Sequence, residues 1–361
     1  MALGDNASII TPKSYNGNII SNICTYYYYK YYNGVITFDC EQTAIDDSAF
    51  YKCTKLSRII IPNSVKAIGD SAFNGCTNLT EVTFGNNVAT IGEKAFNGCT
   101  SLTSAEFPNS VTTIDQKAFY NCTNLTNVTF GNNITEIGSN AFVNCTGLTS
   151  VSIPKSVTTI GSDAFGWYDN LSYISVYIED LVAWCNVVTR GPLVSGSTAE
   201  SSQYSLYLNG KLVTDLVIPD GITAIDNQVF ANCKSLKSLT IPESVTSICY
   251  DAFSGCTNLT SITIPDSVTT IGNRAFYHCD RLASITIPDS VTRIGSYAFE
   301  YCNNLEKVYC KAAIPPTLGS EVFRTAYGTV PNIYVPRASV SAYKSAENWS
   351  KYASRIYGYD F

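Results

Sequence analysis

The 361-residue chain has few charged residues and no excess of positive charge. Asp, Glu, Lys and Arg make up 14% of it, whereas roughly a quarter is usual for a soluble domain. Its net charge of −6 gives no basic footprint for nucleic acid, so we expect no nucleic-acid partner. No stretch approaches the ~18 apolar residues of a membrane-spanning helix, which predicts no membrane insertion.

The sequence also lacks the motifs of common catalytic and cofactor sites. It has a single histidine, His278, and no C-x-x-C pair, so it cannot supply the ligands of a zinc finger. It has no G-x-S-x-G nucleophile elbow and no phosphate-binding or dinucleotide-binding glycine pattern. We therefore expect no metal, no cofactor and no enzyme, and we expect His278 to be a solvated loop residue.

A secretory leader is not visible. The opening residues MALGDNASIITPKS have no basic start followed by an apolar stretch. We expect either that a leader is not present in this chain, or that the protein leaves its cell without one, as a virion component does on lysis.

What the sequence does have is a 23-residue repeat marked by phenylalanine. An alanine precedes nearly every one of these phenylalanines, a cysteine follows most of them by three positions, and a leucine follows by six. A fixed period of this length is typical of a solenoid. The phenylalanines are Phe50, Phe73, Phe96, Phe119, Phe142 and Phe165, followed by Phe230, Phe253, Phe276 and Phe299.

The unit that begins at Leu259 reads LTSITIPDSVTTIGNRAFYHCDR. Ile262 and Ile264 alternate with small polar residues, which predicts a strand with one buried face. Pro265 ends the strand because it cannot donate to a ladder. The G-x-x-A-F-x-x-C segment is too short for a full helix, and predicts a 3₁₀ or single-turn helix.

One coil of this kind cannot bury its own apolar face, but stacked coils can. We therefore predict a mainly-β solenoid of about 12–13 coils. Short parallel strands would form one face, short 3₁₀ or helical turns the other, and a helical cap the C-terminal end.

The consensus L-x-x-I-x-I-P-x-S-V-x-x-I-G-x-x-A-F-x-x-C resembles the unit of the BspA-like leucine-rich repeat family, named after a bacterial surface antigen. The resemblance covers nearly the whole chain, from Val35 to Cys310. It implies a leucine-rich-repeat solenoid. It also implies a surface or secreted bacterial protein that binds host proteins or other cells.

The repeat is interrupted once. Phe165 and Phe230 are not a whole number of 23-residue units apart, so one coil carries an insertion, and insertions in solenoids often mark a binding face. We predict one continuous solenoid domain in five segments. These are an N-terminal cap (1–34), a repeat array (35–170), an irregular coil with the insertion (171–211), a second array (212–310) and a C-terminal cap (311–361).

Local patterns predict elements within these segments. Ile178–Trp184 has the pattern of a short amphipathic helix, and Asn209-Gly210 is a strong hairpin signal. In the C-terminal cap we expect a strand at Ile333–Val335 and a helix at Ser339–Trp349 that covers the end coil. The tyrosine-rich stretch in residues 1–34 indicates a capping hairpin, with an aromatic contact patch as the alternative.

Nine of the fourteen cysteines follow the repeat. Stacking would place their thiols about 5 Å apart, within reach of a disulfide. Equivalent side chains in a stack point in parallel, however, which favours reduced, buried thiols. Because an oxidising compartment would normally pair the remaining cysteines, an anaerobic niche or an intracellular origin is favoured. Those remaining are Cys24, Cys40, Cys185, Cys249 and Cys310.

The outward strand positions are mostly Ser and Thr, which lack the aromatic and arginine anchors of tight interfaces. The exceptions predict a ligand-contact site. Tyr173, Tyr177 and Trp184 lie beside the insertion, and Lys307 and Tyr309 lie near the end of the second array. A neutral face without a discrete contact site is an equal alternative.

These features predict a non-enzymatic binding or adhesion protein at the bacterial cell surface or outside the cell, whose rigid repeat surface contacts a protein or glycan on a host or neighbouring cell. A structural or host-recognition component of a phage virion is the second hypothesis, because the leader is absent and the thiols are unpaired. The third is an enzyme with its site in the insertion. Its carboxylates would be Glu179 and Asp180, but adjacent residues of a helix point apart, which favours a solvated face instead.

Overall fold

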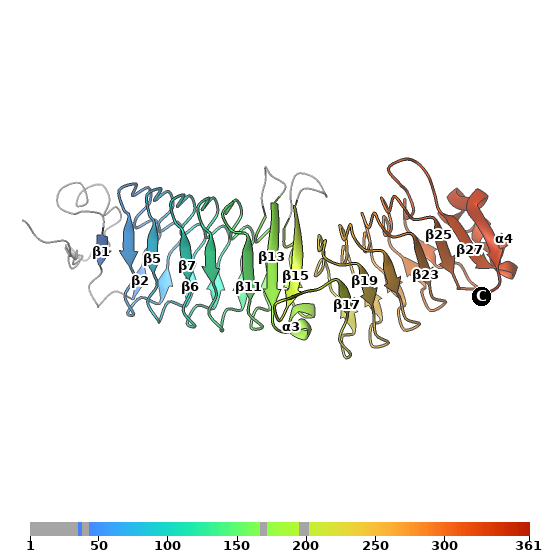
Figure 1. Ribbon diagram of the computed structural model, residues 1–361, viewed down its shortest axis with the longest axis horizontal. Helices are drawn as coiled ribbons and strands as arrows, with labels where there is room; N and C mark the ends of the chain where they lie inside the picture. Colours follow the sequence, from blue (N-terminus) through green and yellow to red (C-terminus); the bar gives the residue numbers. More distant parts are fainter. Residues whose placement is uncertain (1–34, 38–42, 167–171, 195–201) are drawn as a thin grey trace, which may run out of the picture. The chain divides into compact units, whose positions relative to one another are not determined.

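The computed structural model describes residues 35–37, 43–166, 172–194 and 202–361. The chain forms two compact units, each described here by itself (Figure 1). The first comprises Met1–Glu179 with Leu193–Ser197, and the second comprises Asp180–Pro192 with Thr198–Phe361. The division falls within the predicted irregular coil. The predicted cap at 1–34 lies outside the described residues, and the five segment boundaries stay a prediction.

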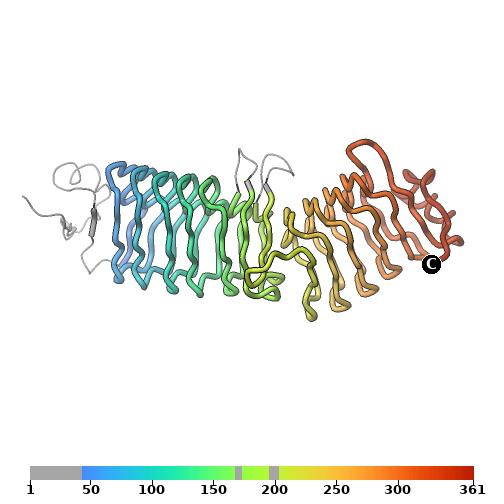
Figure 2. Tube along the Cα trace, in the orientation of Figure 1, coloured from blue at the N-terminus to red at the C-terminus, as the bar shows by residue number. Residues whose placement is uncertain are grey.

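The first unit winds through successive coils (Figure 2). Each complete 23-residue coil contributes two short strands. The strands pair in parallel with the equivalent strands of the next coil, so that Arg58 lies opposite Glu81 and Ala67 opposite Thr90. The first series is β1 (Val35–Thr37), β3 (Arg58–Ile60), β5 (Glu81–Thr83), β7 (Ser104–Glu106), β9 (Asn127–Thr129), β11 (Ser150–Ile153) and β13 (Ser172–Ile178). The second series is β2 (Ala44–Ile45), β4 (Ala67–Ile68), β6 (Thr90–Ile91), β8 (Thr113–Ile114), β10 (Glu136–Ile137) and β12 (Thr159–Ile160).

The second unit repeats this arrangement and adds a helical cap. Its first series is β17 (Asp215–Val217), β19 (Ser238–Thr240), β21 (Ser261–Thr263), β23 (Ser284–Ile287), β25 (Lys307–Cys310), β27 (Asn332–Pro336) and β28 (Ile356–Tyr359). Its second series is β18 (Ala224–Ile225), β20 (Ser247–Ile248), β22 (Thr270–Ile271), β24 (Arg293–Ile294) and β26 (Thr317–Leu318). The remaining elements are α3 (Leu181–Cys185), β14 (Val188–Thr189), β15 (Ser202–Leu208), β16 (Lys211–Leu212), η1 (Arg337–Ser339), α4 (Val340–Ser345) and η2 (Trp349–Arg355).

The first series of strands confirms the strand expected from the alternation of Ile262 and Ile264 with polar residues. The second series was not predicted. Each of its strands has only two residues, such as Thr270 and Ile271, which is too short to show an alternating pattern. Their pairing comes from the stacking of coils, so no local signal marks them.

The repeat phenylalanines form the core of each unit. The rings of Phe73 and Phe96 stack at 4.9 Å between centroids, and those of Phe96 and Phe119 at 5.0 Å. In the second unit, Phe253 and Phe276 stack at 5.5 Å. All five side chains are fully buried, which confirms the predicted single file. Each stacked aromatic pair adds about 0.5–1.5 kcal/mol beyond the area that it buries.

We call the segment around each core phenylalanine the turn edge of the coil. It is a series of turns rather than the predicted short helix. The amide of Asn74 donates to the carbonyl of Ser71 at 3.0 Å, which is the spacing of a 3₁₀ helix. Ser71 and Gly75, however, have φ of +56° and +77°, and left-handed residues four positions apart prevent a helix from continuing. The edges of successive coils pair instead, since the amide of Phe73 donates to the carbonyl of Ala95 at 2.7 Å.

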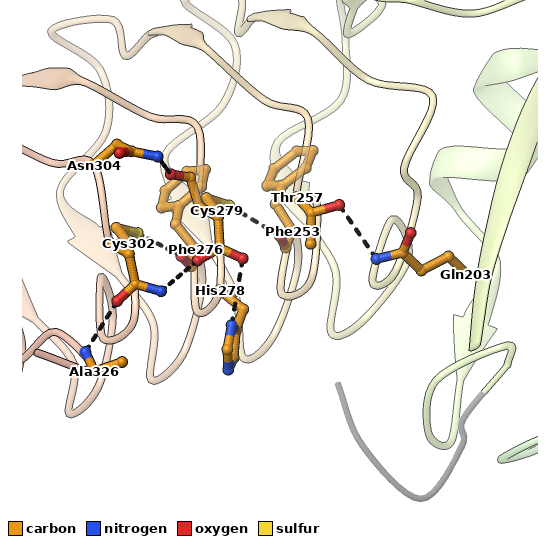
Figure 3. Close-up of polar contacts among 11 residues, drawn as sticks. Gln203, Phe253, Thr257, Phe276, His278, Cys279, Cys302, Asn304 and Ala326 are labelled. Atoms are coloured by element: carbon orange, nitrogen blue, oxygen red, sulfur yellow. Dashed lines mark hydrogen bonds and ion pairs between the residues drawn. The ribbon is translucent and has the colours of Figure 1, made fainter. Parts of the chain in front are cut away.

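The repeat cysteines link one coil to the next through their thiols. Cys279 donates to the carbonyl of Phe253 at 3.4 Å, and Cys302 to that of Phe276 at 3.1 Å (Figure 3). Burial raises the pKa of the Cys76 thiol to about 12, so this thiol stays a protonated donor. The prediction of reduced, buried thiols is confirmed for Cys76, Cys99, Cys122, Cys145, Cys233, Cys256, Cys279 and Cys302.

The first cysteine of the column departs from this prediction. Cys53 is disulfide-bonded, so the expectation of a reduced thiol is wrong at this position. Among the described residues, the phenylalanine column begins in the same coil, at Phe50, and no earlier phenylalanine carbonyl is there to accept from the Cys53 thiol. Of the cysteines outside the column, Cys24 and Cys40 lie outside the described residues.

Small polar side chains take the place of charges on the outside of the coils. The hydroxyl of Thr269 donates to the carbonyl of Thr246 at 3.2 Å, and that of Thr292 to the carbonyl of Thr269 at 3.3 Å. The amide of Ser296 donates to the side chain of Asn273 at 2.9 Å. Because each coil satisfies the polar groups of its neighbour in this way, the fold uses hydroxyl and amide side chains where other domains carry charges.

The irregular coil differs in detail from the prediction. Ile178 ends strand β13 and is buried, so the helix that was expected to begin there begins at α3 instead. Asp180 caps this helix, since its Oδ1 accepts from the amide of Ala183 at 2.9 Å. Asn209 and Gly210, with φ of +50° and +76°, join β15 and β16 in an antiparallel hairpin, as predicted.

The C-terminal cap covers the last coil with aromatic side chains. The hydroxyl of Tyr343 on α4 donates to the carbonyl of Ala312, and the indole of Trp349 donates to the carbonyl of Pro316, both at 2.8 Å. Tyr343 and Trp349 are fully buried. The cap therefore covers the end coil, as predicted. Strand β27 includes the predicted strand at 333–335.

The cap helix is shorter than the predicted Ser339–Trp349. Ala346 is extended, with ψ of 150°, and Asn348 is left-handed, with φ of +61°. These two residues end α4 and turn the chain into η2 and the additional strand β28.

The core and the outward positions should differ sharply in their tolerance of truncation. Replacing Phe253 by Ala should lower the free energy of unfolding by about 3–5 kcal/mol, because it removes a ring stacked on both sides. Replacing Thr263, on the exposed side of β21, should change it by less than about 0.5 kcal/mol. Chemical denaturation of the full chain measures both, and equal effects at the two positions would contradict the observed strand facing.

Thiol reactivity should follow burial. Cys249 is half-buried, whereas Cys256 is fully buried, so a maleimide added to the native protein should modify Cys249 first. Mass spectrometry of the two peptides, with Cys249→Ser as the control, measures the two rates. Modification of Cys256 as fast as Cys249 in the folded protein would show that the column is open to solvent.

Candidate ligand-contact surface

The predicted contact residues fall into three places. Tyr173 and Tyr177 lie on β13 of the first unit, where Tyr173 is 51% exposed and Tyr177 is half-buried. Trp184 lies on α3, which belongs to the second unit, and its side chain is only 3% exposed. Lys307 and Tyr309 lie together on β25 of the second unit.

Trp184 is therefore a packing residue and not a surface anchor. On a short amphipathic helix, the largest apolar side chain is expected to face inward, and Cys185 beside it is also buried. The tyrosines of β13 point outward because strand residues alternate. Ile174, Val176 and Ile178 take the inward positions and are buried.

Tyr309 belongs to a larger aromatic group on β25, β27 and β28, the last three strands of the first series in the second unit, and Lys307 lies at the edge of this group. We call Tyr309, Tyr334, Tyr357 and Tyr359 the tyrosine patch. The parallel register places Tyr309 opposite Tyr334 and Tyr334 opposite Tyr357. Tyr357 and Tyr359 are 43% and 42% exposed.

Ring contacts hold the tyrosine patch together. Tyr309 stacks on Tyr334 at 5.0 Å between centroids, with 18° between the ring planes. Tyr359 meets both of them edge to face, at 5.4 Å from Tyr309 and 5.8 Å from Tyr334. Because the rings already fix one another, a ligand that packs on them would cost little further side-chain entropy.

The edge of the tyrosine patch is polar. Lys307 pairs in register with Asn332 on one side. On the other side, Arg337 donates from Nε to both carboxylate oxygens of Asp360, at 2.7 and 2.8 Å. An aromatic centre with a polar rim is the usual composition of a protein recognition surface.

Three neighbouring strands of this face in the second unit carry small side chains. Their outward residues on β19, β21 and β23 are Ser238, Thr240, Ser261, Thr263, Ser284 and Thr286. The tyrosine patch therefore differs in composition from the strands beside it.

Sequence reasoning found Lys307 and Tyr309 but missed Tyr334, Tyr357 and Tyr359. The alternation in NIYVP and IYGY could have indicated two more strands with outward tyrosines. The 23-residue consensus does not extend into the C-terminal cap, so nothing in the repeat placed these strands next to Tyr309.

A second unusual cluster lies on the turn edge of the second unit. His278, expected to be a solvated loop residue, is instead packed between aromatic rings, with its side chain 18% exposed. Its ring centroid lies 4.8 Å from that of Tyr277 and 4.9 Å from that of Tyr301. Its Nδ1 lies 3.6 Å from Oδ2 of Asp280, and Asp280 accepts a 2.7 Å hydrogen bond from Asn303 (Figure 3).

Two buried carboxylates belong to the same cluster. Glu300 is 5% exposed and lies 3.4 Å from Arg324, and Asp251 is 8% exposed. Burial raises the pKa of Glu300, while the charges of Arg324 and Arg274 oppose the rise. Burial likewise raises the pKa of Asp251, opposed by a hydrogen bond from Tyr250 and by the charge of Arg274.

The two carboxylates of the predicted enzyme site have ordinary surroundings. Asp180 is the cap of α3, and Glu179 is exposed. Among the described residues, no group of three or more His, Cys, Asp or Glu side chains could hold a metal ion. Nor does any helix in the described part of the chain have the length and hydropathy of a membrane span.

The coil geometry and the repeat columns agree with a known family. The model of the BspA type leucine rich repeat region matches residues 43–172 and 202–329, in six copies. The chain belongs to the BspA-type leucine-rich repeat family. Its fold is the mainly-β leucine-rich-repeat solenoid, with about 13 turns of about 23 residues and a small helical cap. The repeats of this family are typically non-enzymatic.

Solved structures extend this likeness. The crystal structure of a leucine rich cell surface protein from Faecalibacterium prausnitzii A2-165 is 26% identical, covers 88% of this chain and 87% of its own, and has a TM-score of 0.51. The pneumococcal vaccine antigen PcpA is 20% identical, covers 84% and 77%, and has a TM-score of 0.53. At its lower identity, PcpA shows the fold alone. No curated protein matches this chain significantly.

The buried carboxylates predict a pH dependence of stability. The folded-state pKa of Glu300 and of Asp251 lies above the unfolded value, which is roughly 4. The folded state therefore favours the protonated form of each carboxyl group. The contribution of this form to the free energy of unfolding is fully present below the unfolded pKa, and it is lost as the pH rises through the folded pKa. As the pH falls from about 7 to about 4, the wild type should gain Tm relative to an Asp251→Asn, Glu300→Gln variant.

Thermal unfolding of both full-length proteins, followed by circular dichroism, measures this difference. A Tm difference that is the same at both pH values, or that shrinks in acid, would contradict the assignment.

Proposed function

We propose that this chain is a non-enzymatic binding protein of the bacterial cell surface, and that the tyrosine patch of its second unit contacts a protein or glycan on a host or neighbouring cell. The observation that carries the proposal is the group of ordered, partly exposed tyrosines beside strands β19, β21 and β23, whose outward residues are Ser and Thr. Tyrosine is among the residues that supply most binding energy at interfaces, while small hydroxyl side chains contribute little.

The surface location rests on the family and on one relative. The Faecalibacterium prausnitzii protein is described as a cell surface protein and shares nearly its full length with this chain. The unpaired thiols that suggested the virion alternative are present in the described residues, but most of them are buried in the repeat core, so they do not favour a virion over a surface protein.

The rigidity of the repeat supports a binding role. Each coil is tied to the next by paired strands, stacked rings and hydrogen bonds, so the outward face keeps its shape when a ligand arrives. Tyr173 and Tyr177 on β13 remain a second proposed contact point, in the first unit. Their strand is also fixed by pairing, with Ser175 opposite Ser150.

Binding of the purified chain to immobilised extracellular-matrix proteins, mucins and bacterial glycans tests the proposal. A Tyr357→Ser, Tyr359→Ser variant should bind its ligand at least about tenfold more weakly, since losing such anchors typically costs more than 1 kcal/mol each. A Ser261→Ala, Thr263→Ala variant on the same strand face is the matched control and should bind normally.

Two outcomes would overturn the assignment. One is that no tested protein or glycan binds. The other is that the tyrosine and control variants bind alike while a Tyr173→Ser, Tyr177→Ser variant loses binding, which would place the contact on β13.

A further inference from the structure

The turn edge of the second unit departs from the repeat in four successive coils. Its cluster contains aromatic, basic and acidic side chains next to the core phenylalanines. The core columns pack equally well in the first unit, where the same positions carry mostly small or neutral residues, so the fold does not require this cluster. Its members are Tyr250, Asp251, Arg274, Tyr277, His278, Tyr297, Glu300, Tyr301 and Arg324. The equivalent positions of the first unit carry Ser71, Asn74, Gly75, Asn97, Gly98, Asn121, Asn140 and Asn144, together with Tyr51, Lys52, Lys94, Lys117, Tyr120 and Asp163, but no arginine or histidine.

Two guanidinium groups of the cluster are held in fixed orientations. The Cζ of Arg274 lies 5.4 Å from the ring centroid of Tyr277 and 5.6 Å from that of Tyr297. The Cζ of Arg324 lies 5.8 Å from the ring of Tyr301. Both arginines are exposed. A guanidinium has five N–H donors in a planar fork, and ring contacts fix the plane without using all of these donors.

Two buried polar atoms of the cluster have no hydrogen-bond partner. Oδ1 of Asp251 has none, although its Oδ2 accepts from Gln228 at 3.5 Å. Nδ1 of His278 also has none, since its 3.6 Å distance from Asp280 is too long for a hydrogen bond. Buried polar atoms in native proteins nearly always have partners, so both atoms can make a further hydrogen bond. Oδ1 of Asp163, at the equivalent position of the first unit, also has no partner, but no arginine of the turn edge accompanies it.

The surface beside Asp251 can open. Tyr250, the residue before Asp251, is 41% exposed, and Arg274 is exposed as well. Tyr250 is a long surface side chain with several rotamers, so a ligand can displace it and reach the carboxylate while Arg274 keeps its place on the rings of Tyr277 and Tyr297.

The charges of the cluster limit the class of ligand. Arg274 and Arg324 are matched by Asp251 and Glu300, and Asp280 lies 3.6 Å from His278, so no single sign of charge selects an anionic or a cationic ligand. A neutral, hydroxyl-rich ligand fits better. Each hydroxyl group can donate to the open oxygen of Asp251 and accept from the guanidinium of Arg274, while an apolar ring face can pack on the exposed tyrosines.

We propose that this cluster on the turn edge of the second unit is a binding site for a neutral saccharide. Arg274 and Asp251 hold its hydroxyl groups, and Tyr250 supplies a stacking face. The site lies on the turn edge and not on the strands that carry the tyrosine patch, so it is a second site that goes beyond the function proposed above.

An array of neutral oligosaccharides of glucose, galactose, mannose and N-acetylglucosamine, probed with the full chain and followed by calorimetry on the bound sugars, tests the proposal. Arg274→Lys, which keeps the charge but loses the fork, and Asp251→Asn should each weaken binding at least about tenfold. The matched control is a Lys117→Ala, Tyr120→Ala variant, which removes a cation–tyrosine pair from the turn edge of the first unit and should bind normally. Circular dichroism and Tm show that each variant is folded.

The Tyr357→Ser, Tyr359→Ser variant separates this site from the tyrosine patch. Retained sugar binding in that variant, together with loss in Arg274→Lys and Asp251→Asn, supports the proposal. Loss in the tyrosine variant with full binding in the other two would overturn it and assign the sugar to the tyrosine patch. An array without any bound neutral oligosaccharide would overturn it as well, and would leave the tyrosine patch open to a protein ligand.

Discussion

The contact of each side chain with its own equivalent one coil away is the interaction on which the structure depends. Within each unit, phenylalanine stacks on phenylalanine at about 5 Å between ring centroids. The thiol that follows most of these rings bonds to the phenylalanine carbonyl of the preceding coil. One phenylalanine carbonyl thus accepts hydrogen bonds from two coils. The carbonyl of Phe73 accepts from the thiol of Cys99 in the next coil and from the amide of Cys76 in its own coil, the latter at 3.1 Å. These contacts run along the axis of the array, so stability depends on neighbouring coils in register.

This arrangement leaves the outward positions free to vary. In most coils they are Ser, Thr and Asn, whose side chains bond to the backbone of the preceding coil and keep the surface nearly uncharged. Against this background, two places in the second unit stand out: the tyrosine patch on β25, β27 and β28, and the charged aromatic cluster around Arg274. Neither contributes to the core columns. A repeat protein can therefore acquire a binding surface by changing a few outward residues without changing its fold.

Much of the fold could be predicted because the period itself carries the information. The spacing of the phenylalanines gave the solenoid, and the alternation around Ile262 gave the inward and outward faces. The two-residue strands such as β22 could not be predicted, because pairing with the next coil creates them. The left-handed residues of the turn edge were also missed. Residues as different as Ser71, Lys94 and Arg274 share this conformation, so no residue type marks it.

The candidate site was less predictable, because contact surfaces arise where the repeat ends or changes. Lys307 and Tyr309 were found on a repeat strand, whereas Tyr334 and Tyr357 lie in the cap, where the period gives no register. Trp184 was misjudged because exposure on a short helix depends on packing that the sequence does not show. His278 was misjudged for a related reason: its neighbours Tyr277 and Tyr301 lie on different coils.

Hydrogen exchange of the turn-edge amides tests the stacking account most directly. The amide of Phe96 donates to the carbonyl of Ala118 at 2.7 Å, between fully buried columns. The account predicts that this amide and those of Phe73 and Phe119 exchange only on unfolding of the array, far more slowly than the amide of Gly210 in the exposed hairpin turn. Exchange at Phe96 as fast as at Gly210 would contradict it, because coils that open one at a time cannot be held together by their neighbours.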